Sequence, residues 1–413
     1  MTDAMTALER LISPHTVDEF LARYFEQTFL HVRRDANPLA DYLAGLISFD
    51  DLDLLLTTIC SAGPQRWDAV RLSQNGTEIL PGEYQGSRYG PFAEYDVARM
   101  LSLYRNGATI ILNAVERTVP AVADFCNDLA EFFGVPVSAN VYVTPPRGHG
   151  FAAHHDSHDV FLLQVTGHKD WKLYGSPVPL RTSQNRAEAR HGAVRPEAEL
   201  RLRAGEVLYL PRGLVHEGAA SEETSFHVTI GVRPYTWALL LADAAAELQE
   251  EELALRRLVA PRLAAATEPS MRPAVAETAA RLSERLAERL RDSDLVFRLI
   301  ANRVADTPSQ HRPPLRGRFN RLVAPPPIDP ATVLRLSPEE KGVSMQASGE
   351  EVVVTAREKV LTFPGFVEPH LRALLGGPPT CAAALPRDLD EAGRLVLVRR
   401  LADEGLLEVV DAG

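Results

Sequence analysis

Two histidines and one aspartate in this sequence have the residue types and the order expected of ligands for a divalent metal. His154 and Asp156 are one residue apart, and in a strand residues i and i+2 point to the same face. A third candidate, His216, follows an apolar run and a Pro-Arg-Gly turn in residues 205–213. Two imidazoles and one carboxylate form a facial triad that holds non-haem Fe(II) and leaves the remaining positions open. We therefore predict that these three residues bind a metal and carry the catalysis.

Other ionisable residues near this pair are expected to have supporting roles. Because the chain holds 12 histidines, a single His-x-Asp pair is weak evidence, and the prediction depends on the order of the features around it. We expect His155, His158 and His168 to lie at the surface or behind the ligands. Asp159 is expected to accept hydrogen bonds and not to bind the metal.

Lys169 independently indicates an anionic ligand. After the expected turn at Thr166 and Gly167, alternation places Lys169, Trp171 and Leu173 on one face of a strand, and the face that bears Trp and Leu should look inward. A buried ammonium without a partner is costly and requires an anion. A dicarboxylate such as 2-oxoglutarate, which chelates iron through its C1 carboxylate and keto oxygen, would supply one. The alternative is a lysine that reaches the rim of the barrel.

The elements that must position these residues lie between residues 137 and 232. Short β-branched and aromatic runs occur there, broken by Pro and Gly and without a helical pattern between them. The expected strands cover residues 138–144, 160–165, 169–174, 206–210 and 226–232. Strands at this spacing predict an all-β barrel or jelly roll.

The first 130 or so residues are predicted to be mostly helical. Apolar residues at helical spacing predict a helix over 17–25, with Thr16 as its N-cap and Glu19 as its capping-box partner. Further helices are expected over 50–60 and over 119–133, the last with a proline in its first turn.

A second helical region is expected at 235–304. Its apolar stripe consists of Val275, Ala279, Leu282, Leu286 and Leu290. Such a stripe must pack on something, and two partners remain open: the barrel, or the same helices of a second subunit.

A proline-rich boundary at 305–330 separates a small C-terminal segment of mixed strands and helices. We expect strands at 351–355 and 406–410 and helices at 368–375 and 389–404, a pattern typical of winged helices. From Arg321 onward 10 basic and 14 acidic side chains occur, so DNA binding is not expected. The expected domains are 1–234, 235–312 and 313–413.

Composition limits the class of protein. The 413 residues, 45% of them hydrophobic and 24% charged, are enough for two or three globular domains. A net charge of -11 disfavours nucleic acid as a partner. Three scattered cysteines indicate neither a disulfide framework nor a zinc ribbon. Without a secretory signal or an apolar run long enough to span a membrane, the expected location is cytoplasmic.

At these residues the sequence resembles the JmjC-type, cupin-4 family of Fe(II)/2-oxoglutarate oxygenases, in particular the ribosomal oxygenases, which hydroxylate side chains of ribosomal proteins. The matching segments are residues 140–146, 150, 154–156, 159–161, 164, 167–171, 208–213, 216 and 227–229. The likeness is specific over 140–232 and looser at 30–33. Beyond residue 232 it depends on architecture alone.

The resemblance implies an α+β fold with a double-stranded β-helix (jelly-roll, cupin) core, N-terminal helices, a helical dimerisation region and a C-terminal winged-helix-like domain. It implies that His154, Asp156 and His216 bind Fe(II) and that Lys169 binds the distal carboxylate of 2-oxoglutarate. Asn140, Tyr142 and His227 are implied near the substrate or cosubstrate pocket. The implied reaction uses O2 and 2-oxoglutarate to hydroxylate an unactivated C–H bond, with succinate and CO2 as co-products.

The substrate class stays open at this point. The main hypothesis is a homodimeric hydroxylase of a His or Arg side chain in a ribosomal protein. Lys169 places the chain nearer to the relatives that hydroxylate histidine, whereas Gly231 stands where those relatives tend to have serine. The alternatives are tailoring of a small molecule or peptide natural product, a non-catalytic dimeric interaction protein, and histone demethylation, for which the sequence offers no chromatin-reading module.

Overall fold

The structure is a computed structural model that divides into two compact units, Met1–His311 and Arg312–Gly413. Each unit is described by itself. The expected boundary at 234 falls within the first unit. The residues that the structure describes are 5–33, 38–61, 65–66, 68–89, 92–183, 195–259, 272–310, 323, 327–337, 343–356 and 359–410.

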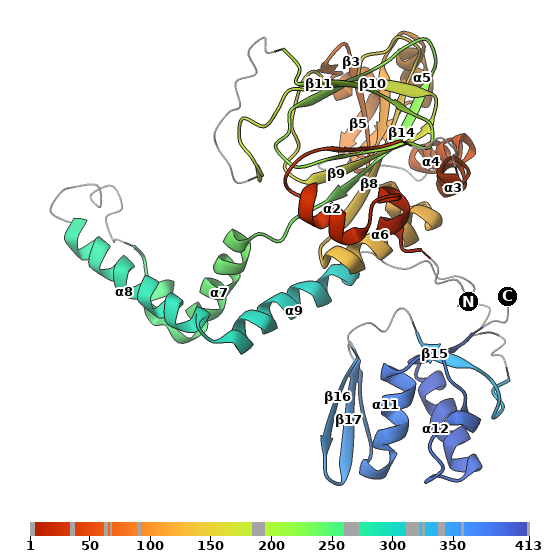
Figure 1. Ribbon diagram of the computed structural model, residues 1–413, viewed down its shortest axis with the longest axis vertical. Coiled ribbons are helices and arrows are strands. Elements are labelled where there is room, and N and C mark those ends of the chain that lie inside the picture. The colour runs from red at the N-terminus through yellow and green to blue at the C-terminus, as the bar shows by residue number, and fades with distance from the viewer. Residues whose placement is uncertain are drawn as a thin grey trace. The chain divides into compact units, whose positions relative to one another are not determined.

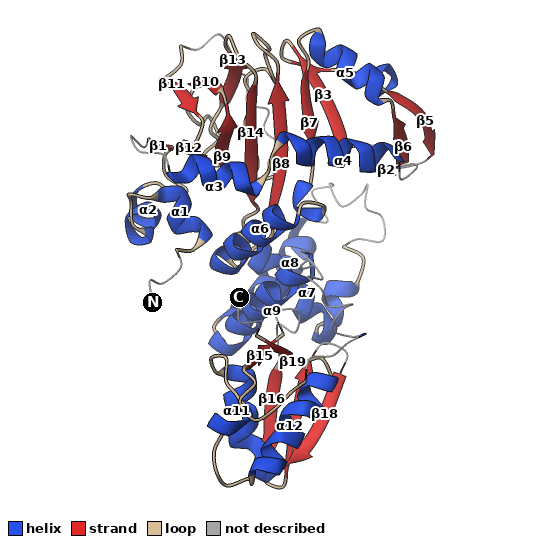
Figure 2. Ribbon diagram, turned by 90° about the vertical axis from the view of Figure 1, so that its right-hand side faces the viewer, coloured by secondary structure: helices blue, strands red, loops and turns tan. Residues whose placement is uncertain are grey.

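Two facing β-sheets form the barrel of the first unit (Figures 1 and 2). Among the described residues the larger sheet has eight strands, in the spatial order β1 (Leu30–Val32), β12 (Val207–Leu210), β9 (Asp159–Thr166), β14 (Ser225–Val232), β8 (Val137–Thr144), β7 (Thr109–Leu112), β3 (Val70–Gln74) and β4 (Thr77–Glu78). The smaller sheet consists of β11 (Ala198–Arg203), β10 (His168–Leu173) and β13 (His216–Ala220).

The chain passes back and forth between the two sheets, as a double-stranded β-helix requires. From β8 it crosses to the smaller sheet, where isolated bridges pair His149 with Ala219 and His154 with His216. It returns to the larger sheet in β9, crosses again for β10 and β11, and then alternates through β12, β13 and β14. The predicted jelly-roll core is therefore confirmed, with all five expected strands present.

Strand β9 shows how the barrel obtains a core on each face of the larger sheet. Phe161 and Leu163 belong to the core beneath the helices, whereas Val160 and Leu162 belong to a second core between the two sheets. Successive side chains of a strand point to opposite faces, so a continuous apolar run supplies both cores.

Helices of the N-terminal region pack against the larger sheet: α6 contacts β8 and β14, and α3 contacts β9. They are α1 (Ala7–Ile12), α2 (Val17–Arg23), α3 (Pro38–Leu46), α4 (Phe49–Ser61), α5 (Val97–Arg105) and α6 (Pro120–Phe133). The three expected helices are confirmed, and the Thr16 hydroxyl caps α2 by accepting from the Glu19 amide at 3.1 Å. The Glu19 carboxylate, however, pairs with His15 and Arg23.

The prediction of a mostly helical N-terminal region missed seven short strands. Strands β1, β3, β4 and β7 widen the larger sheet, and β2 (Gln65–Arg66), β5 (Gln85–Tyr89) and β6 (Phe92–Tyr95) form a separate three-stranded sheet. The β-branched run Thr109–Leu112 pairs with β8 and β3 and is buried throughout. Its partners lie elsewhere in the sequence, so local periodicity does not reveal it.

Three helices follow the barrel: α7 (Trp237–Glu251), α8 (Arg272–Leu290) and α9 (Ser293–Gln310). A small apolar core joins them through Ala244, Leu295 and Leu299, with Leu286 and Leu290 packed against it. The end of the predicted stripe thus packs within this group of helices. Helix α9 also contacts α6 and runs five residues past the expected boundary at residue 305.

The second unit contains two small sheets and two α-helices within its described residues. The sheets are β15–β19 (Leu334–Leu336 and Leu407–Val409) and β16–β17–β18 (Ser344–Ser348, Glu351–Ala356 and Lys359–Pro364), and the helices are α11 (Glu368–Gly376) and α12 (Glu391–Asp403). All four elements expected here are present. Most of the expected proline-rich boundary lies outside the described residues. No described helix of the chain is long and apolar enough to span a membrane.

A buried ion pair fixes the turn that precedes His216. The Arg212 guanidinium donates to Asp159 Oδ2 at 2.7 Å and to Glu26 Oε1 at 2.5 Å, and the Tyr209 hydroxyl donates to Asp159 Oδ1 at 2.9 Å. Both Arg212 and Asp159 are buried. The expectation that Asp159 accepts hydrogen bonds is thus met, and the pair ties the start of β9 to the end of β12.

Substituting Arg212→Met should lower the free energy of unfolding by about 3–5 kcal/mol, because Asp159 would keep a buried charge without its partner. The double variant Asp159→Asn/Arg212→Met should recover part of this loss. Denaturant titrations measure both. Arg201→Met, which breaks the exposed pair with Asp170, is the matched control and should leave the midpoint almost unchanged; an equal loss in the control would show that the buried pair has no special role.

Candidate metal centre

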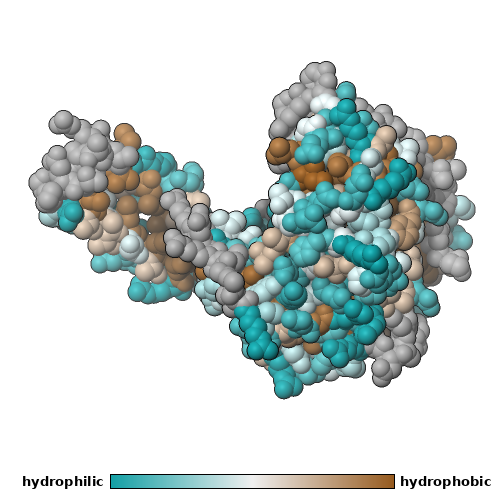
Figure 3. All heavy atoms as spheres, turned by 90° about the horizontal axis from the view of Figure 1, so that it is seen from above, coloured by the Kyte–Doolittle hydropathy of each residue, from teal (hydrophilic) through white to brown (hydrophobic). Residues whose placement is uncertain are grey.

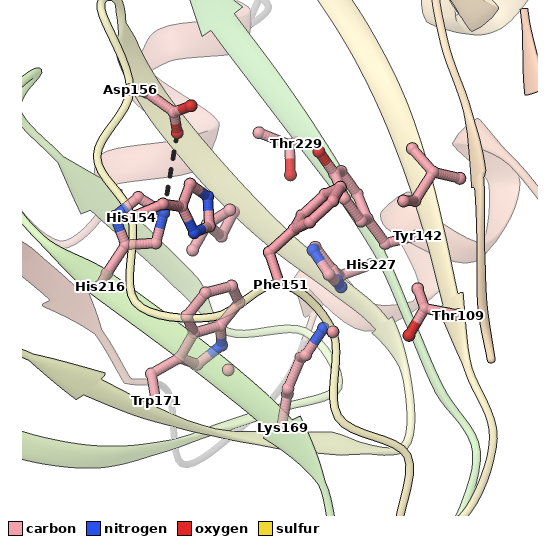
Figure 4. Close-up of a pocket in the computed structure, with 14 residues that line it drawn as sticks. Thr109, Tyr142, Phe151, His154, Asp156, Lys169, Trp171, His216, His227 and Thr229 are labelled. Carbon is pink, nitrogen blue, oxygen red and sulfur yellow. Dashed lines mark ion pairs between the residues drawn. The ribbon is translucent and has the colours of Figure 1, made fainter. Parts of the chain in front are cut away.

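The structure brings the three predicted ligands together. Ligand atoms of His154, Asp156 and His216 all lie within 4.8 Å of one another, and no other such cluster of His, Cys, Asp and Glu occurs among the described residues. His154 and His216 exchange backbone hydrogen bonds of 3.0 and 2.8 Å. In Figure 4 Asp156 faces His216, with Oδ2 3.6 Å from the imidazole Nε2. One antiparallel bridge therefore joins residues that are far apart in the sequence.

Backbone carbonyls orient both imidazoles. His154 Nδ1 lies 2.9 Å from the carbonyl of Ala152, and His216 Nδ1 lies 2.9 Å from that of Leu214. A nitrogen bonded to a carbonyl must carry the proton, so in the neutral ring Nε2 keeps its lone pair. This arrangement is typical of metal-binding histidines.

Electrostatics keeps the centre ready for a cation. Burial, and then the nearby His154, lowers the pKa of His216 to about 4, so this ring is neutral at physiological pH. Burial by itself would raise the pKa of Asp156, but the surrounding imidazoles, His216 foremost, bring it below its ordinary value. Neutral imidazoles and an ionised carboxylate are the forms that bind metal.

Lys169 lies inside the barrel, as predicted. It is 3% exposed, and burial lowers its pKa to about 7. Nζ donates to Thr144 Oγ1 at 3.3 Å and lies 5.3 Å from the centre of the Trp171 ring. No described carboxylate lies within 4.0 Å of it. The alternative of a lysine that reaches the barrel rim is therefore wrong, and the cavity holds an ammonium that an anionic ligand would stabilise.

The cavity between the triad and Lys169 has aromatic walls, and about 450 Å³ of space there, part of it open to solvent, is free of protein atoms (Figure 4). His227 stacks on Tyr142 at 4.8 Å and meets Trp171 edge-on at 5.7 Å. Burial, assisted by Lys169, holds the pKa of His227 well below its ordinary value, and burial raises that of the Tyr142 phenol. Neither His227 Nδ1 nor Trp171 Nε1 has a hydrogen-bond partner in the part of the chain described.

Of the predicted pocket residues, Tyr142 and His227 line the cavity, whereas Asn140 does not belong to its lining. Asn140 Oδ1 instead accepts from the amide of Ala114 at 3.0 Å, where the backbone has a φ of 57°. Asn140 therefore holds the chain that follows β7.

Several lining residues were not predicted from the sequence. Thr109 and Ile111 belong to β7, which lies in a region that the sequence predicts to be mostly helical. Phe151 lies 5.6 Å from His154, ring to ring. The β3–β4 hairpin holds the backbone before Phe151, because the Gly76 amide donates to the carbonyl of Gly150 at 2.9 Å. The β-branched run of β7 could have predicted Thr109 and Ile111. No local sequence pattern predicts that Phe151 lines the cavity.

Substituting Lys169→Met should raise the free energy of unfolding of the ligand-free protein by an amount on the order of a few kcal/mol, because it removes a buried charge without a counter-ion. The gain must depend on pH. Between about pH 7 and 10.5 the unfolded chain holds a proton on Lys169 that the folded chain has lost, so wild-type stability rises with pH through this window.

Denaturant titrations at about pH 6 and pH 9 would therefore find a larger difference between Lys169→Met and wild type at the lower pH. Lys172→Met, at an exposed position of the same strand, is the control and should show no such difference. A destabilised Lys169→Met variant would mean that the ammonium has a partner in the folded protein.

Comparison with known proteins agrees with this geometry. Residues 114–240 match the JmjC domain model. The chain is 32% identical over 267 residues to human ribosomal oxygenase 1, covering 62% of this chain and 39% of that protein. It is 28% identical over 260 residues to the bifunctional lysine-specific demethylase and histidyl-hydroxylase NO66 of Dictyostelium discoideum, covering 60% and 48%.

The fold is shared with a solved bacterial structure. Escherichia coli ribosomal oxygenase YcfD superposes with a TM-score of 0.53 at 18% identity, over 96% of this chain and 98% of that one. The chain spans less than half the length of both relatives named above. Residues 114–240 therefore match a JmjC domain, and the chain is similar to the ribosomal oxygenases over about three fifths of its length.

Proposed function

We propose that this protein is an Fe(II)- and 2-oxoglutarate-dependent oxygenase. The observation that carries the proposal is the placement of a His-Asp-His cluster and a buried, anion-free lysine on the walls of one cavity. A metal alone would need the cluster but not the lysine. A dicarboxylate that chelates the metal at one end and pairs with Lys169 through its other carboxylate accounts for both.

The residues present fit these two groups. His154, Asp156 and His216 would hold Fe(II), a metal that two imidazoles and a carboxylate suit. Lys169 would pair with the distal carboxylate of 2-oxoglutarate, and Thr144 would donate a hydrogen bond beside it. A solved structure of the E. coli ribosomal oxygenase contains cobalt and 2-oxoglutarate, which is the same pair of ligand types. When bound, iron and 2-oxoglutarate would supply the oxidising chemistry, consuming O2 and releasing succinate and CO2.

The protein's own part is to hold, shield and orient. The carbonyls of Ala152 and Leu214 fix the tautomers of the two histidines. Trp171, Phe151 and Tyr142 exclude water from the cavity and thereby strengthen every charge interaction inside it. His227 would remain neutral beside Lys169 and could donate a hydrogen bond to a bound carboxylate without adding a second charge.

For the substrate, we infer a His or Arg side chain of a ribosomal protein. The names of the relatives, a ribosomal oxygenase and a histidyl-hydroxylase, support this choice. The net charge of -11 would attract a basic ribosomal protein over long range. Tailoring of a small molecule or peptide is the second candidate. A purely structural dimeric protein is disfavoured because an unpaired buried lysine would have no purpose there.

We also propose that the chain acts as a homodimer through its helical region, with residues 1–234 as the oxygenase domain, 235–312 as the dimerisation region and 313–413 as a winged-helix-like domain. Apolar side chains gather on the helices that follow the barrel, seen in brown in the left-hand part of Figure 3. Trp237, Leu241 and Phe297 are 77%, 43% and 70% exposed. A second copy of the same helices would cover such a face.

Turnover of 2-oxoglutarate by the protein supplied with Fe(II) tests the activity. His154→Ala should abolish succinate formation, a larger loss than the roughly 10- to 100-fold caused by losing a partner of a ligand. Lys169→Met should raise the KM for 2-oxoglutarate by about 30-fold or more, because it removes a buried charged hydrogen bond worth about 2 kcal/mol.

With ribosomal proteins added, one of them should gain 16 Da in the wild-type reaction only. His15→Ala, at a surface histidine paired with Glu19, is the matched control and should behave as wild type. Succinate formation without any protein gaining oxygen would favour the small-molecule candidate. A wild-type protein that binds neither Fe(II) nor 2-oxoglutarate would contradict the proposal altogether.

Light scattering coupled to gel filtration tests the dimer. The wild type should elute at twice its monomer mass of 45.4 kDa, and the double variant Trp237→Glu/Phe297→Glu should elute as a monomer. Leu54→Glu, at an exposed apolar position of α4, should remain dimeric. A wild-type monomer at all concentrations tested would refute the dimer.

A further inference from the structure

A second, larger cavity adjoins the metal centre. About 860 Å³ of space there, part of it open to solvent, is free of protein atoms, and its lining includes Ser157, His158, Ser183, Arg233, Thr236 and Leu239. Asp156 lines the first cavity, and the next two residues of the chain line the second. The loop that carries the metal ligands therefore contributes to both spaces.

Strand β14 connects the two cavities on its inner face. His227 and Thr229 line the first cavity, and Arg233, directly after the strand, lines the second. Alternation puts Gly231 on the same face, between them. Arg233 lies four residue steps beyond Thr229, which in extended chain is a distance of roughly 13 Å at about 3.3 Å per residue.

The imidazole of His158 occupies the space that a side chain at position 231 would fill. A Cβ built on Gly231 would lie 2.6 Å from His158 Cδ2 and 2.8 Å from His158 Nε2. His158 therefore lies against the backbone of β14 where the row of cavity-lining side chains is interrupted. His158 also lines the second cavity, so a larger residue at 231 would displace its ring.

The lining of the second cavity has a distinct chemistry. Among its described lining residues one carries a guanidinium, none carries a carboxylate, and four carry hydroxyl groups, namely Ser157, Thr182, Ser183 and Thr236. Arg233 is exposed, and no described carboxylate lies within 4.0 Å of its side chain. Burial raises the pKa of Glu116, and hydrogen bonding together with the charges of Arg117 and Arg233 opposes this rise. The cavity thus offers hydrogen-bond donors and a free positive charge.

We propose that this second cavity is a substrate subsite that receives a polypeptide segment flanking the modified residue, within about four residues of it, and that Arg233 selects acidic or neutral side chains in that segment. The inference rests on the proposed function, because it presumes that the target side chain enters the first cavity. The subsite would prefer acidic or neutral residues next to the target, whereas the net negative charge of the whole protein attracts a basic partner.

A charge reversal tests the subsite. With total ribosomal proteins of the source organism as the probe, Arg233→Glu should lower hydroxylation of the target, measured as kcat/KM, by about 10-fold or more. Succinate formation in the absence of protein should not change. Arg105→Glu, at an exposed arginine of α5 that belongs to neither cavity lining, changes the net charge equally and should have little effect.

A second experiment changes the charge of the substrate instead of the charge of the protein. In a synthetic peptide of the mapped target, lysine at the flanking acidic or neutral positions should slow the wild type and favour Arg233→Glu. Independently, Gly231→Ala should impair peptide hydroxylation by displacing His158 into the subsite, and Gly231→Ala/His158→Ala should recover it. Such rescue would not follow from damage to β14 alone.

The outcomes separate the two proposals. Equal activity of Arg233→Glu and Arg105→Glu, or a preference of the wild type for lysine-flanked peptide, overturns the subsite. Triad-dependent turnover of 2-oxoglutarate without oxygen added to any ribosomal protein also overturns it but leaves the oxygenase in place. Absence of turnover in the wild type contradicts the oxygenase itself.

Discussion

The site depends on one short antiparallel bridge, the pair of backbone hydrogen bonds between His154 and His216. It places two imidazoles side by side and leaves Asp156 within reach of both. The bridge would be weak alone, but neighbouring contacts hold both of its strands. On one side the Gly213 amide donates to the carbonyl of Asp156 at 2.9 Å. Behind them, Arg212 and Asp159 join the two segments through a buried ion pair.

A second constraint is the ammonium of Lys169 in the core between the two sheets. A fold that maximised its own stability would place an apolar side chain there, since burying an unpaired cation disfavours the folded state. The cost is tolerated where a ligand of opposite charge removes it. The aromatic residues around the cavity increase both the cost without the ligand and the gain with it, because they keep water away from the charge.

Much of the fold and of the candidate site was predictable. The alternation of Lys169, Trp171 and Leu173 placed the lysine inside the barrel, and His-x-Asp with a later histidine identified the cluster. These features depend on strand periodicity, which is local. The strands β3 and β7, the Phe151 wall and the position of Asn140 were not predictable, because their partners are remote in sequence. The same holds for Arg212, whose pairing with Glu26 and Asp159 joins three distant segments.

The sequence by itself determined the residue types that can bind a metal and an anion, the strand that turns Lys169 inward, and the helices around positions 17–23, 49–61 and 120–133. Only the tertiary structure decided which residues close the cavity, that His158 lies against Gly231, and that a second space with a free arginine follows the first. The reason is physical: side-chain direction along one strand follows from a period of two residues, whereas the neighbours of a side chain are set by strand pairing and by packing between sheets.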